Sequence, residues 1–487
     1  MVETPPSRPP GLTRRALLAG LGAGAGLLAA RGLGTPALYA GNESTIRTDE
    51  AIRRLAVSLT PRQRELIVFP YDHPTRQIAN TIAVIARPHL GTLLSPTQRA
   101  GVEELYLSLL SARGREAFAG TVAVEGRLDG CVLALYGEPE GGRTQAVLMG
   151  GHLMLRGGGD PAESVAFGGG IAYGHQTGNG HWRVPGNSFA FHGDAANRVY
   201  AQLSPAERAL AVLPTPPHEL VLQVRGAGGT FPGARVGDLS EAAQDELGRL
   251  LATVLVSYPE AEQARARDAI DANGGPGALH VSYFASHGFY EDMASFASLD
   301  EAERTRRGDP YWQVWRLEGP GTIVHFKGSP HVHAYVQVVR DPRRANVGET
   351  LATTSDGLEG EALRALLERT LRSATGEPLA FHSNEIPGRF CPGEITTGLA
   401  YSLDPYRSHV VVATIEGRAM AAPLRDRLAA AGTPVEESQR YRIATLEYFA
   451  GRPDLVGKPE RVDTSALLLR DALVSHLRAG GLASATG

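Results

Sequence analysis

Residues 312–342 read WQVWRLEGPGTIVHFKGSPHVHAYVQVVRDP, and this stretch decides the class of the fold. It holds three runs of alternating or β-branched residues, Trp312–Leu317, Thr322–Phe326 and His331–Val339, which Gly and Pro residues separate. This pattern predicts three short strands, the last two of them paired as a hairpin.

The third predicted strand has one apolar and one polar face. Side chains alternate along a strand, so Val332 and Ala334 face one side, while His331, His333 and Tyr335 face the other. Two imidazoles at positions i and i+2 of a rigid strand can bind one metal ion. We therefore predict His331 and His333 as ligands of a divalent metal ion. The alternative is a pair of hydrogen-bonded histidines in the core or at a sheet edge.

His152 and Glu291 are further candidates for the same site. His152 follows a pair of glycines that let another group approach the backbone closely, and we predict it as a third metal ligand. Glu291 lies close to His287 in the sequence and could orient or supplement a metal ligand, although a solvated helix start is the simpler explanation. The candidate catalytic residues are His152, His325 and Glu291.

The position of His325 depends on the register of the hairpin. If Phe326 pairs with Pro330, His325 shares the face of His331 and His333. If Phe326 pairs with His331, His325 lies on the opposite face.

The rest of the first 350 residues mixes helices and strands. Two segments, at 95–98 and 204–207, match a capping box with Pro at the first helical position, and an apolar stripe predicts a third helix over 239–258. Further strands are predicted at 121–125, 130–136 and 145–155. Strands and helices do not alternate strictly, so we predict an α+β domain, with helices and a mostly antiparallel sheet, over residues 42–350.

From about residue 351 the pattern changes, which predicts a second, smaller α/β domain over residues 351–487. Its predicted helices are 360–373, 419–431 and 465–479, and its predicted strands are 379–381, 410–415 and 441–444.

The N-terminus predicts export. Arg14 and Arg15 precede an apolar run of 15 residues that ends at Ala30, which is too short and too rich in Gly for a stable membrane anchor. A paired Arg before a weakly hydrophobic run is typical of the signal read by the twin-arginine translocase, and an ordinary Sec signal is the alternative. We predict a signal peptide over residues 1–41 and a periplasmic or extracellular protein that meets the translocase during export.

Composition excludes some classes of function. The net charge is only −4, so no basic surface is predicted for nucleic acid. Cys131 and Cys391 are the two cysteines and fall in different predicted domains, which argues against a disulfide framework or a thiolate metal site.

The ordered motifs of residues 50–350 resemble the DUF3500 family, a family of unknown function. The matching stretches are Gly151-His152-Leu153, Trp315-Arg316-Leu317-Glu318-Gly319-Pro320, Pro330-His331-Val332-His333 and Arg340-Asp341-Pro342. Gly151 replaces one His of a His-His pair, Pro330 replaces an Asn, and His325 stands where an acidic residue is expected. The resemblance implies no particular reaction.

Residues 360–480 resemble the C-terminal domain of 5'-nucleotidases, the half that holds the base and sugar of the substrate. The resemblance rests on Asn384 and Arg389, on Gly393-Glu394-Ile395-Thr396, on Pro405-Tyr406, and on residues 441–448 with Asp454. It implies a substrate-binding role for Asn384, Arg389, Tyr406 and Arg407. Val456 replaces one of the two stacking rings, and the sequence contains no Asn-His-Glu metal motif, so nucleotidase activity itself is not implied.

Together these features predict an exported, metal-binding hydrolase that acts on an anionic or nucleoside-like small molecule. A copper- or iron-dependent oxidoreductase and a non-catalytic binding protein of the cell envelope are the alternatives.

Replacing Arg14 and Arg15 together by Lys should leave the precursor in the cytoplasm, because a Lys pair is poorly read by the twin-arginine translocase. Fractionation and immunoblotting of cells that express the wild-type and the double-mutant chain would measure this. Normal export of the double mutant would contradict the predicted route.

Overall fold

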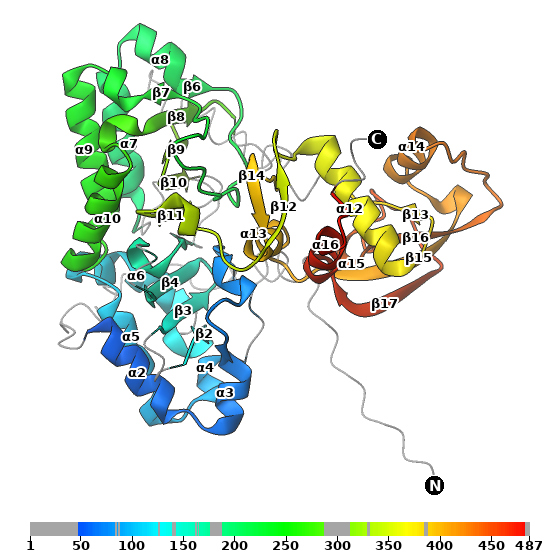
Figure 1. Ribbon diagram of the computed structural model, residues 1–487, viewed down its shortest axis with the longest axis horizontal. Coiled ribbons are helices and arrows are strands. Elements are labelled where there is room, and N and C mark those ends of the chain that lie inside the picture. The colour runs from blue at the N-terminus through cyan, green and yellow to red at the C-terminus, as the bar shows by residue number, and fades with distance from the viewer. Residues whose placement is uncertain are drawn as a thin grey trace, which may run out of the picture. The chain divides into compact units, whose positions relative to one another are not determined.

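The computed structural model describes residues 47–82, 85, 88–124, 127–138, 143–160, 163, 165–175, 188–286, 312–328, 332–383 and 388–482 (Figure 1). By their internal contacts these form a large unit, with residues 47–366, 388–407 and 473–482, and a small unit, with residues 367–383 and 408–472. Part of the predicted domain 351–487 thus belongs to the large unit, and the independent folding of residues 42–350 stays a prediction. The predicted signal peptide lies outside the described residues. No helix within the described ranges is long and apolar enough to cross a membrane.

Eleven strands of the described chain form one mixed sheet in the large unit, in the order β1-β2-β3-β4-β5-β11-β10-β9-β8-β6, with β7 paired to β8. The strands are β1 Val68–Phe69, β2 Val132–Tyr136, β3 Gln145–Gly150, β4 Leu153–Gly158, β5 Ile171–His175, β6 Val212–Leu213, β7 Ala234–Arg235, β8 His280–Phe284, β9 Val314–Gly319, β10 Thr322–Lys327 and β11 Val332–Val338. The pairs β1–β2 and β6–β8 are parallel and the other pairs are antiparallel. The predicted α+β class with a mostly antiparallel sheet is therefore confirmed.

One face of this sheet is apolar and covered by helices. In Figure 1 the helices α7, α9 and α10 lie along one side of β8–β11. Val332, Ala334 and Val336 of β11 belong to the core that these helices complete, as the alternation predicted. The helices of the large unit are α2 Thr48–Ser58, α3 Pro61–Ile67, α4 Leu90–Leu93, α5 Pro96–Ser108, α6 Ala112–Val124, α7 Ala190–Gln202, α8 Pro205–Ala211, α9 Glu241–Leu255, α10 Glu260–Ala272 and α13 Thr397–Leu403.

The opposite face is covered mainly by segments without regular structure. Residues 71–85 and 220–224 contribute apolar side chains that pack on it. Polar side chains of the central strands lie between them. A short two-stranded sheet of β12 Thr350–Thr354 and β14 Gly393–Thr396 completes the large unit.

The two helix starts predicted from capping boxes are correct. Both predicted capping boxes are present: the Ser95 hydroxyl accepts a hydrogen bond from the Gln98 backbone, and the Gln98 side chain accepts one from the Ser95 backbone. The equivalent pair in α8 is Ser204 and Glu207.

Two strand predictions are wrong. The β-branched run predicts a strand over 121–125, but residues 121–124 end α6, because Phe118 and Val122 at i and i+4 bury the same helix face in the core. The pattern also predicts one strand over 145–155, but a tight turn at Gly151 and His152 divides this segment between β3 and β4.

The small unit contains a four-stranded sheet in the order β13-β16-β15-β17, in which only the β13–β16 pair is parallel among the described strands. Its elements are β13 Leu379–Ala380, β15 His409–Glu416, α14 Ala422–Ala430, β16 Arg440–Leu446, α15 Glu447–Ala450 and β17 Arg461–Leu468. The helices α12 Gly360–Thr375 and α16 Leu469–Arg478 have residues in both units. Residues 465–468, predicted to begin the last helix, end β17 instead.

Val332→Asp should unfold the large unit, because Val332 is 1% exposed on the helix-covered face and a carboxylate there would have no partner. We expect a loss of about 3–5 kcal/mol of unfolding free energy, the size of an uncompensated buried charge. Urea unfolding followed by circular dichroism would measure it. Val462→Asp, at a strand position that is 41% exposed, is the matched control and should be nearly neutral. Equal stability of the two variants would contradict the assignment of the faces.

Candidate functional site in the polar layer of the large sheet

The strands β10 and β11 place four polar side chains on the sheet face that lies opposite the helices. Their register pairs Lys327 with His333 and His325 with Tyr335, so all four lie on the same face. All four are buried. The observed register pairs Phe326 with Ala334 and so differs from both registers considered. It nevertheless puts His325 on the face of His333, as the register that pairs Phe326 with Pro330 would.

Glu219 comes from the irregular segment that covers this face, and its carboxylate lies at the centre of the group. Its Oε1 is 2.9 Å from His333 Nδ1, and its Oε2 is 2.8 Å from Lys327 Nζ. The Tyr335 hydroxyl donates a hydrogen bond of 3.3 Å to Oε1. We call Glu219, Lys327, His333 and Tyr335, together with His152, the histidine cluster.

His152 reaches the cluster because of its unusual backbone. It has φ of 65° in the turn between β3 and β4, a conformation that costs energy for a residue with a side chain. Its backbone N–H donates to the Thr81 carbonyl, and its own carbonyl accepts a hydrogen bond of 2.9 Å from Gly174. These bonds hold the imidazole with Nε2 at 2.9 Å from Nε2 of His333.

Gly174 on β5 makes this contact possible. A Cβ at that position would lie 2.0 Å from the Val332 carbonyl oxygen and 3.0 Å from His152 Cδ2. Any side chain there would displace the imidazole or the β5–β11 pairing.

The charges of the cluster can be assigned. Burial alone would raise the pKa of Glu219, but His333 and Lys327 outweigh it and hold that pKa well below its usual value. Burial lowers the pKa of His333, and Glu219 offsets this only in part, so the imidazole is neutral at pH 7. Burial also lowers the pKa of Lys327, against the attraction of Glu219. Glu219 and Lys327 therefore form a buried ion pair beside a neutral histidine.

These charges also fix which nitrogen of His333 carries the proton. Its Nδ1 lies 2.9 Å from the Glu219 carboxylate, an acceptor, and 3.3 Å from Lys327 Nζ, a donor. Because the contact with the carboxylate is the shorter one, Nδ1 carries the hydrogen and donates it to Glu219. The lone pair of His333 is then on Nε2, which faces Nε2 of His152. Without a cation between them, His152 donates the proton of this second hydrogen bond. The result is a chain from Glu219 through His333 to His152.

His325 lies between the histidine cluster and a second group of charges. It pairs across the sheet with Arg316 on one side and Tyr335 on the other. Burial, reinforced by the charge of Arg316, holds the pKa of His325 well below its usual value. Its Nδ1 is buried without a hydrogen-bond partner in the part of the chain that the structure describes.

The second group is a set of arginines around one carboxylate. Glu318 on β9 has its Oε1 at 2.6 Å from Arg225 Nη2 and 3.0 Å from Arg316 Nη2. Arg389 interacts electrostatically with Arg316 and Glu318. Two residues further along the chain, the backbone N–H of Cys391 donates a hydrogen bond of 2.8 Å to the side chain of Gln223, which lies two residues before Arg225. We call Arg225, Arg316, Glu318 and Arg389 the arginine cluster.

The arginine cluster carries more positive charge than its carboxylate can balance. Three guanidinium groups meet Glu318, and a second carboxylate, that of Glu359, lies 3.7 Å from Arg389. Burial lowers the pKa of Arg316, which Glu318 opposes and the charges of Arg225 and Arg389 reinforce. Arg316 Nη2 also donates 2.6 Å to the Val221 carbonyl. Its Nε and Nη1 are buried and make no hydrogen bond to any described residue. Such donors are suited to the oxygens of a carboxylate or phosphate group.

The histidine cluster supplies two candidate ligands for a divalent ion. Two nitrogens that each lie about 2.0–2.1 Å from one ion are about 3 Å apart, close to the observed separation of the His152 and His333 Nε2 atoms. No group of three His, Cys, Asp or Glu side chains able to hold a metal occurs within the described ranges. His331, the remaining predicted ligand, lies outside them. The described donors thus do not complete a metal site, and we derive no step of the chemistry from a metal ion.

The other predicted site residues divide into three groups. Glu291 and Asn384, like His331, lie outside the described residues. Arg389 joins the arginine cluster of the large unit. Tyr406 is half-buried and Arg407 is exposed, with φ of 57°, in the turn that follows α13.

Sequence reasoning missed Glu219, Lys327 and Arg225 as site residues. Lys327 could have been found, because it follows His325 at i+2 on the same strand and so shares its face. Glu219 and Arg225 lie in an irregular segment whose contacts no periodicity predicts.

No protein-family model matches the chain, and no curated protein matches it. A 5'-nucleotidase precursor from Thermus thermophilus is structurally similar, with 14% identity, a TM-score of 0.24, and coverage of 35% of this chain and 47% of that chain. A candidate 5'-nucleotidase from Staphylococcus aureus, solved in complex with alpha-ketoglutarate, has 8% identity, a TM-score of 0.20, and coverage of 35% and 48%. The chain spans about half the length of these solved structures. Membership of residues 50–350 in DUF3500 stays a prediction.

Proposed function

We propose that this chain is a hydrolase acting on a small molecule that carries a carboxylate or phosphate group. The observation that carries the proposal is the excess of guanidinium groups over carboxylates around the buried Arg316, on the same sheet face as a neutral histidine held by a carboxylate. The arginine cluster binds the anionic group of the substrate, and His333 acts as the base.

The cost of buried charge supports a bound anion. Burying an ionised group without a partner is expensive, and the unpaired N–H groups of Arg316 add to the cost. An anion beside Arg225, Arg316 and Arg389 would supply the missing negative charge. The same free energy then binds and orients the substrate.

The arrangement of Glu219, His333 and His152 supports acid–base chemistry. With its Nδ1–H held by Glu219, His333 can accept a proton at Nε2 from a water molecule that attacks the substrate, once that water replaces His152 as the hydrogen-bond donor to Nε2. The water oxygen forms the new bond to carbon or phosphorus, and the bond to the leaving group breaks. The proton then passes from the imidazolium to the leaving group, while the Glu219 carboxylate stabilises the positive charge in between.

Finer features of the proposal rest on the sequence. The resemblance of residues 360–480 to the base- and sugar-holding half of 5'-nucleotidases supports a nucleoside-like substrate, and Arg14-Arg15 supports a reaction outside the cytoplasm. The His152–His333 pair supports a divalent ion only if a further ligand, such as His331, completes its coordination. A non-catalytic anion-binding protein is the second candidate, since the arginine cluster alone would serve it.

Arg389→Gln should weaken anion binding without unfolding the protein, because Arg389 is 27% exposed and removing its charge lowers the repulsion at Arg316. Inorganic phosphate and small dicarboxylates should raise the melting temperature of the wild type. The variant should bind them about tenfold or more weakly, since a hydrogen bond to a charged group contributes about 1.5–3 kcal/mol. Titration calorimetry measures the affinity.

Arg343→Gln is the matched control, because Arg343 is 89% exposed and pairs only with Asp341 among the described acids. It should bind anions as the wild type does. Wild-type affinity in Arg389→Gln, or no anion binding by the wild type, would contradict the role of the arginine cluster.

His333→Gln should lower kcat about 100-fold or more and leave KM nearly unchanged, because it removes the base and not the anion site. The lowered pKa of His333 means that the wild type keeps its neutral base at pH values below about 6.5. The activity of the wild type should fall only as the pH drops through the lowered pKa of His333. The activity that remains in His333→Gln should not show this fall at acidic pH. Chromogenic phosphate and carboxylate esters serve as substrates.

His89→Gln, at an exposed histidine, is the control and should keep the wild-type profile. Elemental analysis of untagged wild type and His333→Gln tests the predicted divalent ion, which should be lost in the variant. Full activity of His333→Gln would contradict the proposed mechanism. Anion binding by the wild type without any hydrolysis would favour the non-catalytic binding protein.

A further inference from the structure

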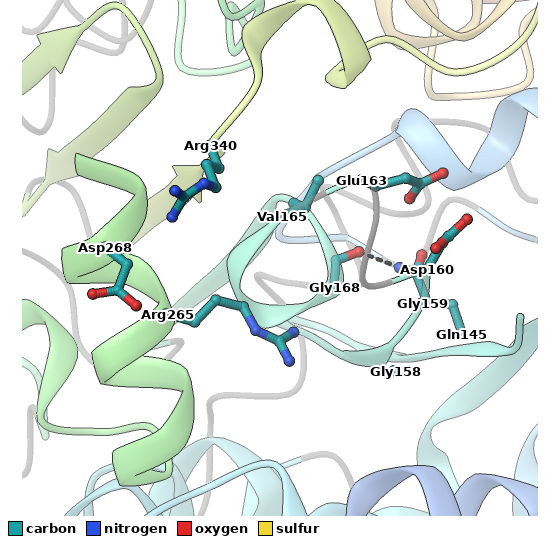
Figure 2. A pocket seen from close by; sticks show the side chains of 10 residues that line it. All are labelled: Gln145, Gly158, Gly159, Asp160, Glu163, Val165, Gly168, Arg265, Asp268 and Arg340. Carbon is teal, nitrogen blue, oxygen red and sulfur yellow. Dashed lines mark hydrogen bonds between the residues drawn. The ribbon is translucent and has the colours of Figure 1, made fainter. Parts of the chain in front are cut away.

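The large unit contains a cavity of about 270 Å³, whose charged lining residues are seen in Figure 2. The two carboxylates of its loop wall are already compensated, because Glu163 pairs with Arg76 and Asp160 pairs with Arg143. The charged residues on its helix side all lie exposed at the surface: Arg265, Asp268 and Arg340. The described lining thus holds no buried, unbalanced charge that would select a ligand, and we assign none to this cavity.

The strand β17 forms one edge of the four-stranded sheet in the small unit (Figure 1). Its regular part, residues 461–464, pairs on one side with residues 411–414 of β15. No described strand pairs with its other side. Alternate residues of this part therefore direct their backbone N–H and C=O groups away from the sheet. Such an edge can pair with a further strand unless the protein blocks it.

Val462 shows that the apolar side of this sheet is left open at the edge. It lies directly across from Ala413, which lies across from Ile443, so the three side chains form one row on the same side of the sheet. Ala413 and Ile443 are 0% exposed, whereas Val462 is 41% exposed and is one of three exposed large apolar side chains among the described residues. A further strand beyond β17 would cover Val462 and continue the row.

The charges on either side of Val462 indicate what this further strand is. Charged residues on an edge often prevent pairing with other chains, but Arg461 and Asp463 have opposite signs and share one side of the strand. In an antiparallel pair with a two-fold axis through Val462, Arg461 of each strand would lie opposite Asp463 of the other. An axis through Arg461 or Asp463 would place like charges opposite each other, and the other axes within residues 461–464 bring no opposite charges together.

We propose that β17 pairs antiparallel with β17 of a second copy of this chain, on a two-fold axis through Val462. The two four-stranded sheets then become one continuous sheet, with the two Val462 side chains in contact on the buried side and two Arg461–Asp463 pairs on the other side. The paired segment is short and buries less surface than a standard interface, so the dimer is weak and forms at high protein concentration. In dilute unfolding experiments the chain is then monomeric, and Val462→Asp stays a neutral control there.

Sedimentation equilibrium of the purified protein, up to submillimolar concentration, tests this dimer. The wild type should dimerise reversibly. Arg461→Asp and Asp463→Arg should each weaken the dimer at least tenfold, because the symmetry places each new pair of like charges in the interface twice. The double variant Arg461→Asp/Asp463→Arg should restore the wild-type affinity to within about threefold, since opposite charges again meet across the axis.

Arg418→Asp is the matched control, because Arg418 is an exposed arginine of the same unit and pairs with an acid two residues away, Glu416, as Arg461 does with Asp463. It should dimerise as the wild type does. Circular dichroism should show that all variants are folded, since the substituted residues lie at the surface. A monomeric wild type, single variants that dimerise as the wild type does, or a double variant no better than the single ones would each overturn the proposal.

Discussion

The carboxylate of Glu219 is the interaction on which the polar layer depends. It compensates the buried ammonium of Lys327 and, through His333 Nδ1, fixes which nitrogen of that imidazole carries the proton. Without this carboxylate, the charged Lys327 would be buried with no counter-ion. No acceptor would then hold the proton of His333 on Nδ1 and leave the lone pair on Nε2, toward His152. One carboxylate therefore sets both the charge balance and the direction of the hydrogen-bond chain.

The two faces of the large sheet differ in polarity because different elements cover them. Helices complete a mainly apolar, closely packed core on one face. Irregular segments cover the other face, and their free carbonyl groups and side chains can meet the polar residues of the strands. Glu219, Arg225 and the Val221 carbonyl all come from such a segment. The larger apolar core therefore lies on one face of the sheet, and the residues of the candidate site lie on the other.

Much of the fold follows from local pattern. The capping boxes, the apolar stripe of α9 and the alternation in β9–β11 each depend on neighbouring residues, so the sequence is enough to predict them. Residues 121–125 show the limit of this reasoning, because burial of Phe118 and Val122 overrides a β-branched run. The candidate site was predictable only in part: the shared face of His325, His333 and Tyr335 follows from strand periodicity, once the register is known.

The sequence by itself determined the α+β class, the strand that carries His333, and the paired arginines of the N-terminus, because each is a property of consecutive residues. Only the tertiary structure decided that His152 turns back in a left-handed conformation to meet His333, and that Glu219 reaches Lys327 and His333 from a distant irregular segment. It alone gathered Arg225, Arg316 and Arg389 around one carboxylate. The physical reason is that charge balance and burial arise from residues far apart in the chain, and no local spacing encodes which of them will meet.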